Sequence, residues 1–235
     1  MKIVVNHLTR MQPGYICVAG IDLATGKAVR PVLENGRLGS VMLVRERGAF
    51  EIGAVVDLGP TRAVGHAPEV EDQEFNRRSA HHLSDMPSAE FWKLLERTAC
   101  NRLTDIFGKD LKPTTHGAAV ELHKGKASLG CLRPAEGPPS LKINPTGKLR
   151  LHLVAGSHDL ALSVTDIRLY ETDQRTPRRA QVENVNRRIA AGVGVLLSVG
   201  LGRAWLKEGD AVERHWLQVN NIHLHDNPTW KDADR

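Results

Sequence analysis

LRLHLVAGSHDLALSVT, residues 149–165, gives the clearest indication of the fold. Leucines at 149, 151 and 153 alternate with Arg150 and His152, and beyond Gly156 the alternation resumes through Leu162 and Val164. Successive side chains of a β-strand point to opposite faces of the sheet. The segment therefore predicts a β-hairpin with one face in the core and Arg150 and His152 on the other.

The first sixty residues have the same character. Short apolar runs at 15–23 and 52–58 are separated by turn signals at Thr25-Gly26 and Asn35-Gly36, and Gly59-Pro60 closes the second run. Glycine and asparagine tolerate the positive φ angles that tight turns require. This region is predicted to form strands joined by tight turns.

Two segments have helical patterns. Residues 87–107 carry apolar side chains at three-and-four spacing up to Gly108, and 177–191 starts at Thr176-Pro177 and stops before Gly192. Such spacing buries one face of a helix, and proline suits the first helical position. We expect both helices to brace the strands, while the polar residues 61–86 form a long surface loop that could contact a protein.

The last predicted strand, residues 216–225, contains an irregularity. Leu217 and Val219 share one parity, whereas Ile222 and Leu224 share the other. A β-bulge near Asn220 would switch the inward face in this way. The order of strands and helices lacks a regular βαβ rhythm, so the chain is predicted to be mainly β, with bracing helices and two small barrels.

Composition limits the compartment and the partner. Cys17, Cys100 and Cys131 lie far apart and form no CxxC pair, which indicates a reducing compartment, and we expect a cytoplasmic protein. No apolar run approaches the roughly 20 residues of a membrane span, so no membrane association is expected. The formal charge of +5 and the pI near 9.3 favour a polyanionic partner.

Three stretches resemble a known family. His7-Leu8-Thr9-Arg10, the run 14–20 and Arg30-Pro31-Val32 are similar to motifs of the bacterial dual OB-containing domain proteins. The resemblance implies two OB-like Greek-key barrels packed together and a role in handling nucleic acid or a nucleotide-like ligand, with no settled activity. It departs from the family at Ala28-Val29, where an aromatic residue usually precedes Arg-Pro-Val. With Gly137-Pro138-Pro139 as the seam, the predicted units are 1–135 and 136–235.

The candidate site follows from how OB barrels bind nucleic acid. A cationic groove follows the phosphates, and aromatic rings stack on the bases. Arginines are plentiful here, but aromatic residues make up only 4% of the chain. We therefore predict a non-catalytic module that binds single- or double-stranded nucleic acid by reading phosphate backbone and shape. The candidate contacts are Arg10, Arg30, Arg37, Arg150, Arg168, Arg187, Arg188, Arg203, Trp205, Arg214 and Trp216.

Two alternatives stay open. The first is a metal-dependent nuclease or nucleotide-processing enzyme, in which His223, His225 and Asp72 hold a divalent metal. The sequence contains no phosphate-binding P-loop and no nuclease-like spacing, so the main prediction includes no cofactor. The second alternative is an adaptor that contacts an acidic protein through residues 61–86 and the helix at 178–188.

Overall fold

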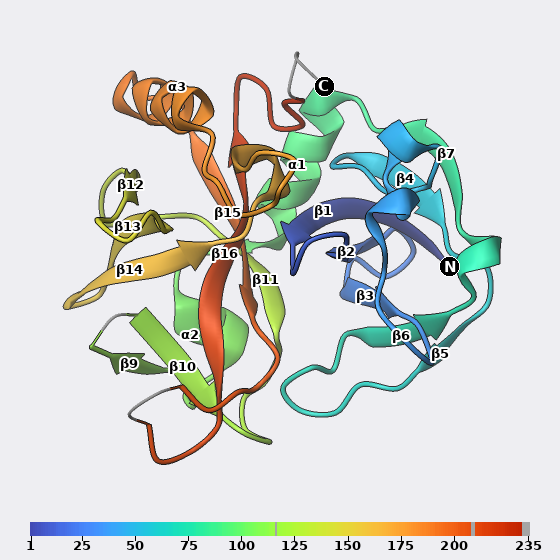
Figure 1. Cartoon of the computed structure of the whole chain (residues 1–235), viewed down its shortest axis with the longest axis horizontal. Helices are drawn as coiled ribbons and strands as arrows, with labels where there is room; N and C mark the ends of the chain where they lie inside the picture. The colour runs from blue at the N-terminus through green and yellow to red at the C-terminus, as the bar shows by residue number, and fades with distance from the viewer. Residues whose placement is uncertain (116, 208–209, 232–235) are drawn as a thin grey trace.

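The fold is mainly β, as the sequence predicts. A computed structural model describes residues 1–115, 117–207 and 210–231, and in these ranges it contains sixteen strands and three α-helices. The strands form a seven-stranded and a nine-stranded sheet (Figure 1). None of the helices in the described ranges is long and apolar enough to span a membrane.

The first sheet has the strand order of an OB barrel. Its strands are β1 (Lys2–Arg10), β2 (Ile16–Asp22), β3 (Ala28–Val32), β4 (Ala54–Asp57), β5 (Thr61–Ala63), β6 (Asp72–Phe75) and β7 (His81–Asp85). β1, β2 and β3 form an antiparallel meander, and β3 pairs in parallel with β6. β4 pairs with β1 and, after Gly59-Pro60, β5 pairs with β6. The interrupted fourth strand thus leads from the fifth back to the first, as in a Greek-key barrel.

The second sheet repeats this order. Its strands are β8 (Ala99–Cys100), β9 (Lys112–Thr114), β10 (Gly117–Glu121), β11 (Leu129–Leu132), β12 (Ser140–Ile143), β13 (Leu149–Ala155), β14 (His158–Val164), β15 (Val195–Leu201) and β16 (Arg214–Leu224). β12, β13 and β14 form the meander, and β14 pairs in parallel with β16. β16 then pairs with β15, and β15 with β11. β11 and β12 are therefore two halves of an interrupted first strand.

Two predictions about strands are confirmed. β13 and β14 form the expected hairpin, in which Leu153 lies opposite Leu160. In the β15–β16 pair, Ser198 lies opposite Asn221 and Val199 lies opposite Val219, so that Asn220 is the extra residue of a β-bulge.

The prediction of one helix over 87–107 is wrong. The segment forms α1 (Ser88–Thr98), then β8, then α2 (Leu103–Phe107), because β8 pairs in parallel with β11 and interrupts the helix. The second predicted helix, 177–191, is observed as α3 (Arg179–Ala190). It starts two residues after Pro177, since Pro177 forms a β-bridge with Tyr170.

Residues 61–86 are not a loop throughout, contrary to the prediction. They contain β5, β6, the 3-10 helix η3 (Arg77–Ser79) and β7. Three further 3-10 helices are η1 (Ser40–Met42), η2 (Val44–Glu46) and η4 (Ile167–Leu169). The strand pattern is hard to see in this segment because β7 is exposed along its whole length and has no apolar alternation.

The expected seam at Gly137-Pro138-Pro139 lies within the second sheet. Gly137-Pro138-Pro139 lies between β11 and β12, and both strands belong to the second sheet. The first core is formed by residues up to Leu95 together with Cys131, Ile167 and Leu196, and the second core starts at Leu103. We therefore propose a boundary near residue 98, between α1 and β8.

Candidate nucleic-acid interface

The outer face of the first barrel is buried. In an OB barrel, the face of strands 2 and 3 and the loops 1–2 and 4–5 bind oligonucleotides. In the first barrel, the corresponding outward side chains of β1–β3 include His7, Thr9 and Arg30, which are only 2, 4 and 5% exposed. The second barrel covers His7 and Thr9, with β16 running across β1, and Arg30 is paired with Asp72.

The β-bulge of β16 makes this contact specific. Asn220 Nδ2 lies 3.0 Å from His7 Nδ1, and the Asn221 side chain hydrogen-bonds both backbone groups of Leu8, at 2.7 and 3.2 Å. Burial, with smaller contributions from His223 and Arg30, lowers the pKa of His7 to about 3, so the ring is neutral. Asn220 Nδ2 must then donate to an unprotonated Nδ1.

An acidic clamp, formed by Glu69, Glu71 and Asp72, fixes the first barrel to the second. Glu71 accepts hydrogen bonds from the backbone N–H and hydroxyl of Ser128, at 2.8 and 2.7 Å, and from the backbone N–H of Leu129 at 3.1 Å. These three bonds occupy both carboxylate oxygens of a residue that is 6% exposed. Its role is therefore to hold the two units together.

The other two clamp residues neutralise two of the predicted contacts. Asp72 pairs with Arg30 at 2.5 Å and with Arg203 at 2.7 Å, and Glu69 pairs with Arg203 at 2.8 Å. Arg30 is buried, so its prediction as a phosphate contact is wrong. Arg203 remains half-exposed, but its charge is balanced by two carboxylates.

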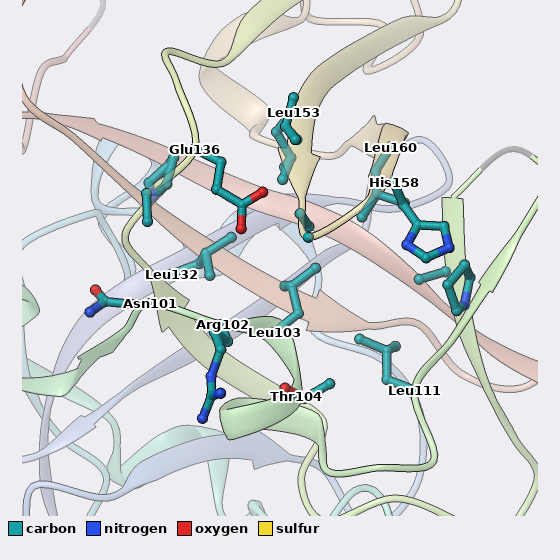
Figure 2. Close-up of a pocket in the computed structure, with 17 residues that line it drawn as sticks. Asn101, Arg102, Leu103, Thr104, Leu111, Leu132, Glu136, Leu153, His158 and Leu160 are labelled. Carbon is teal, nitrogen blue, oxygen red and sulfur yellow. The ribbon is translucent and has the colours of Figure 1, made fainter.

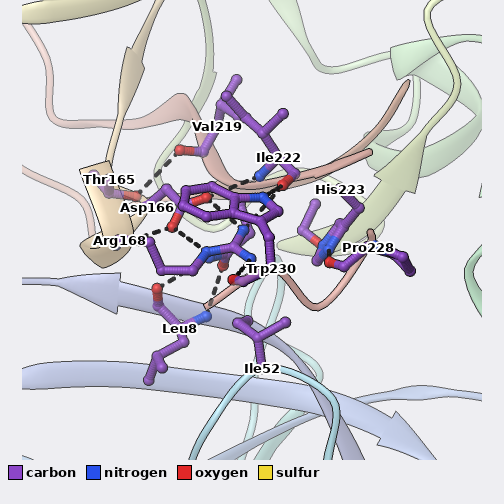
Figure 3. A network of polar contacts seen from close by, with 12 residues as sticks. Leu8, Ile52, Thr165, Asp166, Arg168, Val219, Ile222, His223, Pro228 and Trp230 are labelled. Atoms are coloured by element: carbon purple, nitrogen blue, oxygen red, sulfur yellow. Dashed lines mark hydrogen bonds and ion pairs between the residues drawn. The ribbon is translucent and has the colours of Figure 1, made fainter. Parts of the chain in front are cut away.

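Arg168 is also structural, which corrects a further prediction. Its guanidinium donates to both oxygens of Asp166, at 2.9 and 2.7 Å, and to the carbonyls of Ile222 and Trp230, at 2.9 and 3.2 Å. It also lies 3.9 Å from the centre of the Trp230 ring (Figure 3). At 5% exposure it is inaccessible to a polyanion, and it anchors the segment after β16 to η4.

The remaining arginines differ in their availability. Arg188 on α3 is ion-paired with Asp226, and Arg10 lies 4.1 Å over the Tyr170 ring while donating to the Gln174 carbonyl at 3.0 Å. Arg37 and Arg187 are exposed and have no ion pair among the described residues. Arg37 follows β3 and Arg187 lies on α3, so these two arise from separate elements rather than from one strand face.

The second barrel, in contrast, has an open and cationic outer face. Lys142 on β12 lies opposite Arg150 on β13, Arg150 opposite Ser163 on β14, and Ser163 opposite Gln218 on β16. We call these four residues the cross-strand row. Lys142 is exposed and the other three are half-buried, so the row is accessible from solvent.

The positive charges of this face affect a neighbouring histidine. His152 lies next to the row on β13, and its pKa is lowered by partial burial and by the charges of Lys142 and Arg150. Arg150 also donates to the Ser163 hydroxyl, which orients its guanidinium across the strands. A phosphate approaching the row would thus meet cations already held in position.

Aromatic side chains lie at one end of the same face. Trp216 and Arg214 have the same outward parity on β16 as Gln218, and Trp205 lies in the segment that follows β15. The ring centres of Trp205 and Trp216 are 6.2 Å apart, and Lys207 Nζ lies 5.0 Å from the centre of the Trp216 ring. Trp205 is 51% exposed, so a base could stack on it.

Sequence reasoning found some of this face and missed the rest. Arg150, Arg214, Trp205 and Trp216 were predicted. The candidate list omitted Lys142, Ser163, Gln218 and Lys207. The period-two alternation of each strand would have marked Ser163 and Gln218 as outward-facing, but only strand pairing shows that they lie in one row.

The alternative metal site receives no support. Both ring nitrogens of His223 are occupied by hydrogen bonds within the fold, and burial lowers its pKa to about 4. His225 packs edge-on against Trp92, and Asp72 is held by two arginines. Across residues 1–115, 117–207 and 210–231, no group of three or more His, Cys, Asp or Glu side chains could hold a metal ion.

Two solved structures resemble the chain over most of its length. One is the crystal structure of the Ifi202 HINa domain in complex with 20-bp double-stranded DNA, with a TM-score of 0.34 and 10% identity over 95% of this chain and 93% of that one. The other is a murine DNA-binding protein bound to double-stranded DNA, with a TM-score of 0.34 and 7% identity over 99% and 97% of the two chains.

A search of curated proteins finds no match. The model of the dual OB-containing domain family matches residues 1–222, nearly the whole chain. This match agrees with the duplicated strand order and with the motifs at His7 and Arg30. The chain therefore belongs to the dual OB-containing domain family.

Proposed function

We propose that this protein binds nucleic acid, without catalysis, through the outer face of its second barrel. One observation carries the proposal: the cross-strand row and the tryptophans beside it are exposed or half-buried, whereas the equivalent face of the first barrel is buried. Two barrels of the same strand order thus have different roles. The first supports the second, and the second contacts the ligand.

The chemistry of the face favours phosphate recognition. Lys142 and Arg150 can pair with phosphates, and Ser163 and Gln218 can hydrogen-bond phosphate or sugar oxygens. Such contacts carry little sequence information, so we expect binding that depends on charge and shape. Trp205 is exposed enough for stacking on an unpaired base, which would add affinity for single strands.

Salt dependence tests the phosphate contacts. The dissociation constants of labelled single- and double-stranded oligonucleotides are measured at several salt concentrations. Each phosphate neutralised contributes a slope of about −0.9 for duplex and about −0.7 for single strands in log K against log salt. Lys142→Gln with Arg150→Gln should make the duplex slope less steep by about 2. Arg97→Gln, on the exposed side of α1, is the matched control and should leave the slope unchanged.

Stacking is tested separately. Trp205→Ala should weaken single-strand binding by about 1–3 kcal/mol and leave duplex binding nearly unaffected. Absence of binding at low salt, or equal effects of the row variant and Arg97→Gln, would contradict the proposed face. If Trp205→Ala weakened binding of single strands and of duplex equally, stacking on Trp205 would be contradicted, but the proposed face would not.

A further inference from the structure

A cavity of about 300 Å³ opens at one end of the second barrel. The β13–β14 hairpin, α2, β9, β10 and residues 134–136 surround it (Figure 2). It is separate from the nucleic-acid face, because Leu153 and Leu160 line it from the inward side of the hairpin whose outward side carries Arg150. Its apolar wall is formed mainly by Leu103, Leu111, Ala118, Leu132, Leu153 and Leu160.

The size and lining of the cavity are those of a ligand site. Protein interiors are closely packed and contain few voids larger than a water molecule. At about 30 Å³ for each water-sized group, this cavity has room for about ten non-hydrogen atoms. The mouths of β-barrels are frequent ligand sites, and such sites combine a mainly apolar lining with a few polar groups.

Polar groups at the opening determine the kind of ligand. Figure 2 shows the Glu136 carboxylate turned toward the cavity between Leu132 and Leu153. Glu136 has no hydrogen-bond or ion-pair partner in the part of the chain that the structure describes. Arg102, which also lines the cavity, is held by Asp105 at 2.9 and 3.1 Å. His158 lies at the rim, with Nδ1 3.3 Å from the Ser157 hydroxyl.

We propose that this cavity binds a small amphipathic amine. The apolar body fills the space among the leucines, and the protonated amine donates to the Glu136 carboxylate. A carboxylate-bearing ligand would place its charge against Glu136 and is disfavoured. A neutral alcohol would fill the same apolar space without the charge-assisted bond.

Three probes of similar size distinguish these cases: 2-phenylethylamine, 2-phenylethanol and phenylacetate. Binding of each to the full chain is measured by calorimetry and by chemical-shift changes of the leucine methyl groups. The amine should bind about threefold more tightly than the alcohol, because a solvent-exposed ion pair contributes about 0.2–1 kcal/mol. Phenylacetate should bind most weakly.

Two variants assign the site. Glu136→Gln, on an exposed segment, should weaken binding of the amine about threefold and leave binding of the alcohol unchanged. Ala155→Leu, at the half-buried end of β13, should reduce binding of all three probes by filling the opening, while circular dichroism confirms folding. Equal affinity for amine and alcohol, or no effect of Glu136→Gln, overturns the assignment to amines. No binding of any probe overturns the site itself.

Discussion

Replacing Glu71 with alanine tests whether the acidic clamp holds the two barrels together. The variant loses three hydrogen bonds to Ser128 and Leu129. Both partner residues are buried, at 0 and 6% exposure, so water cannot easily replace the carboxylate. The backbone N–H groups of Ser128 and Leu129 are then left without an acceptor.

The expected cost follows from these contacts. A buried donor without a partner costs about 1–3 kcal/mol, and two backbone donors are affected. Removal of a buried charge offsets part of this, because the charge no longer has to be desolvated. We expect the free energy of unfolding to fall by about 2–4 kcal/mol, which is the cost of two such donors less this offset.

Urea unfolding, followed by tryptophan fluorescence and by circular dichroism, measures this change. Glu74→Ala is the matched control, since Glu74 lies three residues beyond Glu71, on β6, and pairs at 2.9 Å with Arg62, whose side chain is 68% exposed. Such a pair contributes about 0.2–1 kcal/mol. If Glu71→Ala loses no more stability than Glu74→Ala, the clamp does not hold the two barrels together.

Two further predictions concern buried titrating groups. Because burial lowers the pKa of His7 to about 3 and of His223 to about 4, the unfolded chain binds protons between pH 6.5 and these values that the folded chain does not. The free energy of unfolding should therefore decrease as the pH is lowered below 6.5, by at most about 1.4 kcal/mol per pH unit for each histidine. Urea unfolding measured at several pH values should show a smaller decrease for His223→Gln. An unchanged dependence on pH would argue against a contribution from His223. Burial also raises the pKa of Cys131 to about 12, so a thiol reagent should modify it only after unfolding, and rapid labelling of Cys131 in the native protein would contradict this.

Much of the fold follows from local patterns. The alternation at Leu149–Ala155 predicts β13, and the parity change around Asn220 predicts the bulge, because both are properties of one strand and its two faces. Net charge and family motifs, which are also read directly from the sequence, predict a polyanionic ligand. Residues 87–107 show where such reasoning fails, since the pairing of β8 with β11 interrupts a pattern that is otherwise helical.

The availability of each charged side chain was decided only by the tertiary structure. From the sequence, Arg30, Arg168 and Arg150 are equivalent candidates on or beside strands. Asp72, which pairs with both Arg30 and Arg203, lies 42 residues from the first and 131 from the second along the chain, and no local pattern encodes those distances. Alternation shows which side chains leave the core of their own barrel, but whether a second barrel or solvent lies beyond them depends on how the two barrels pack.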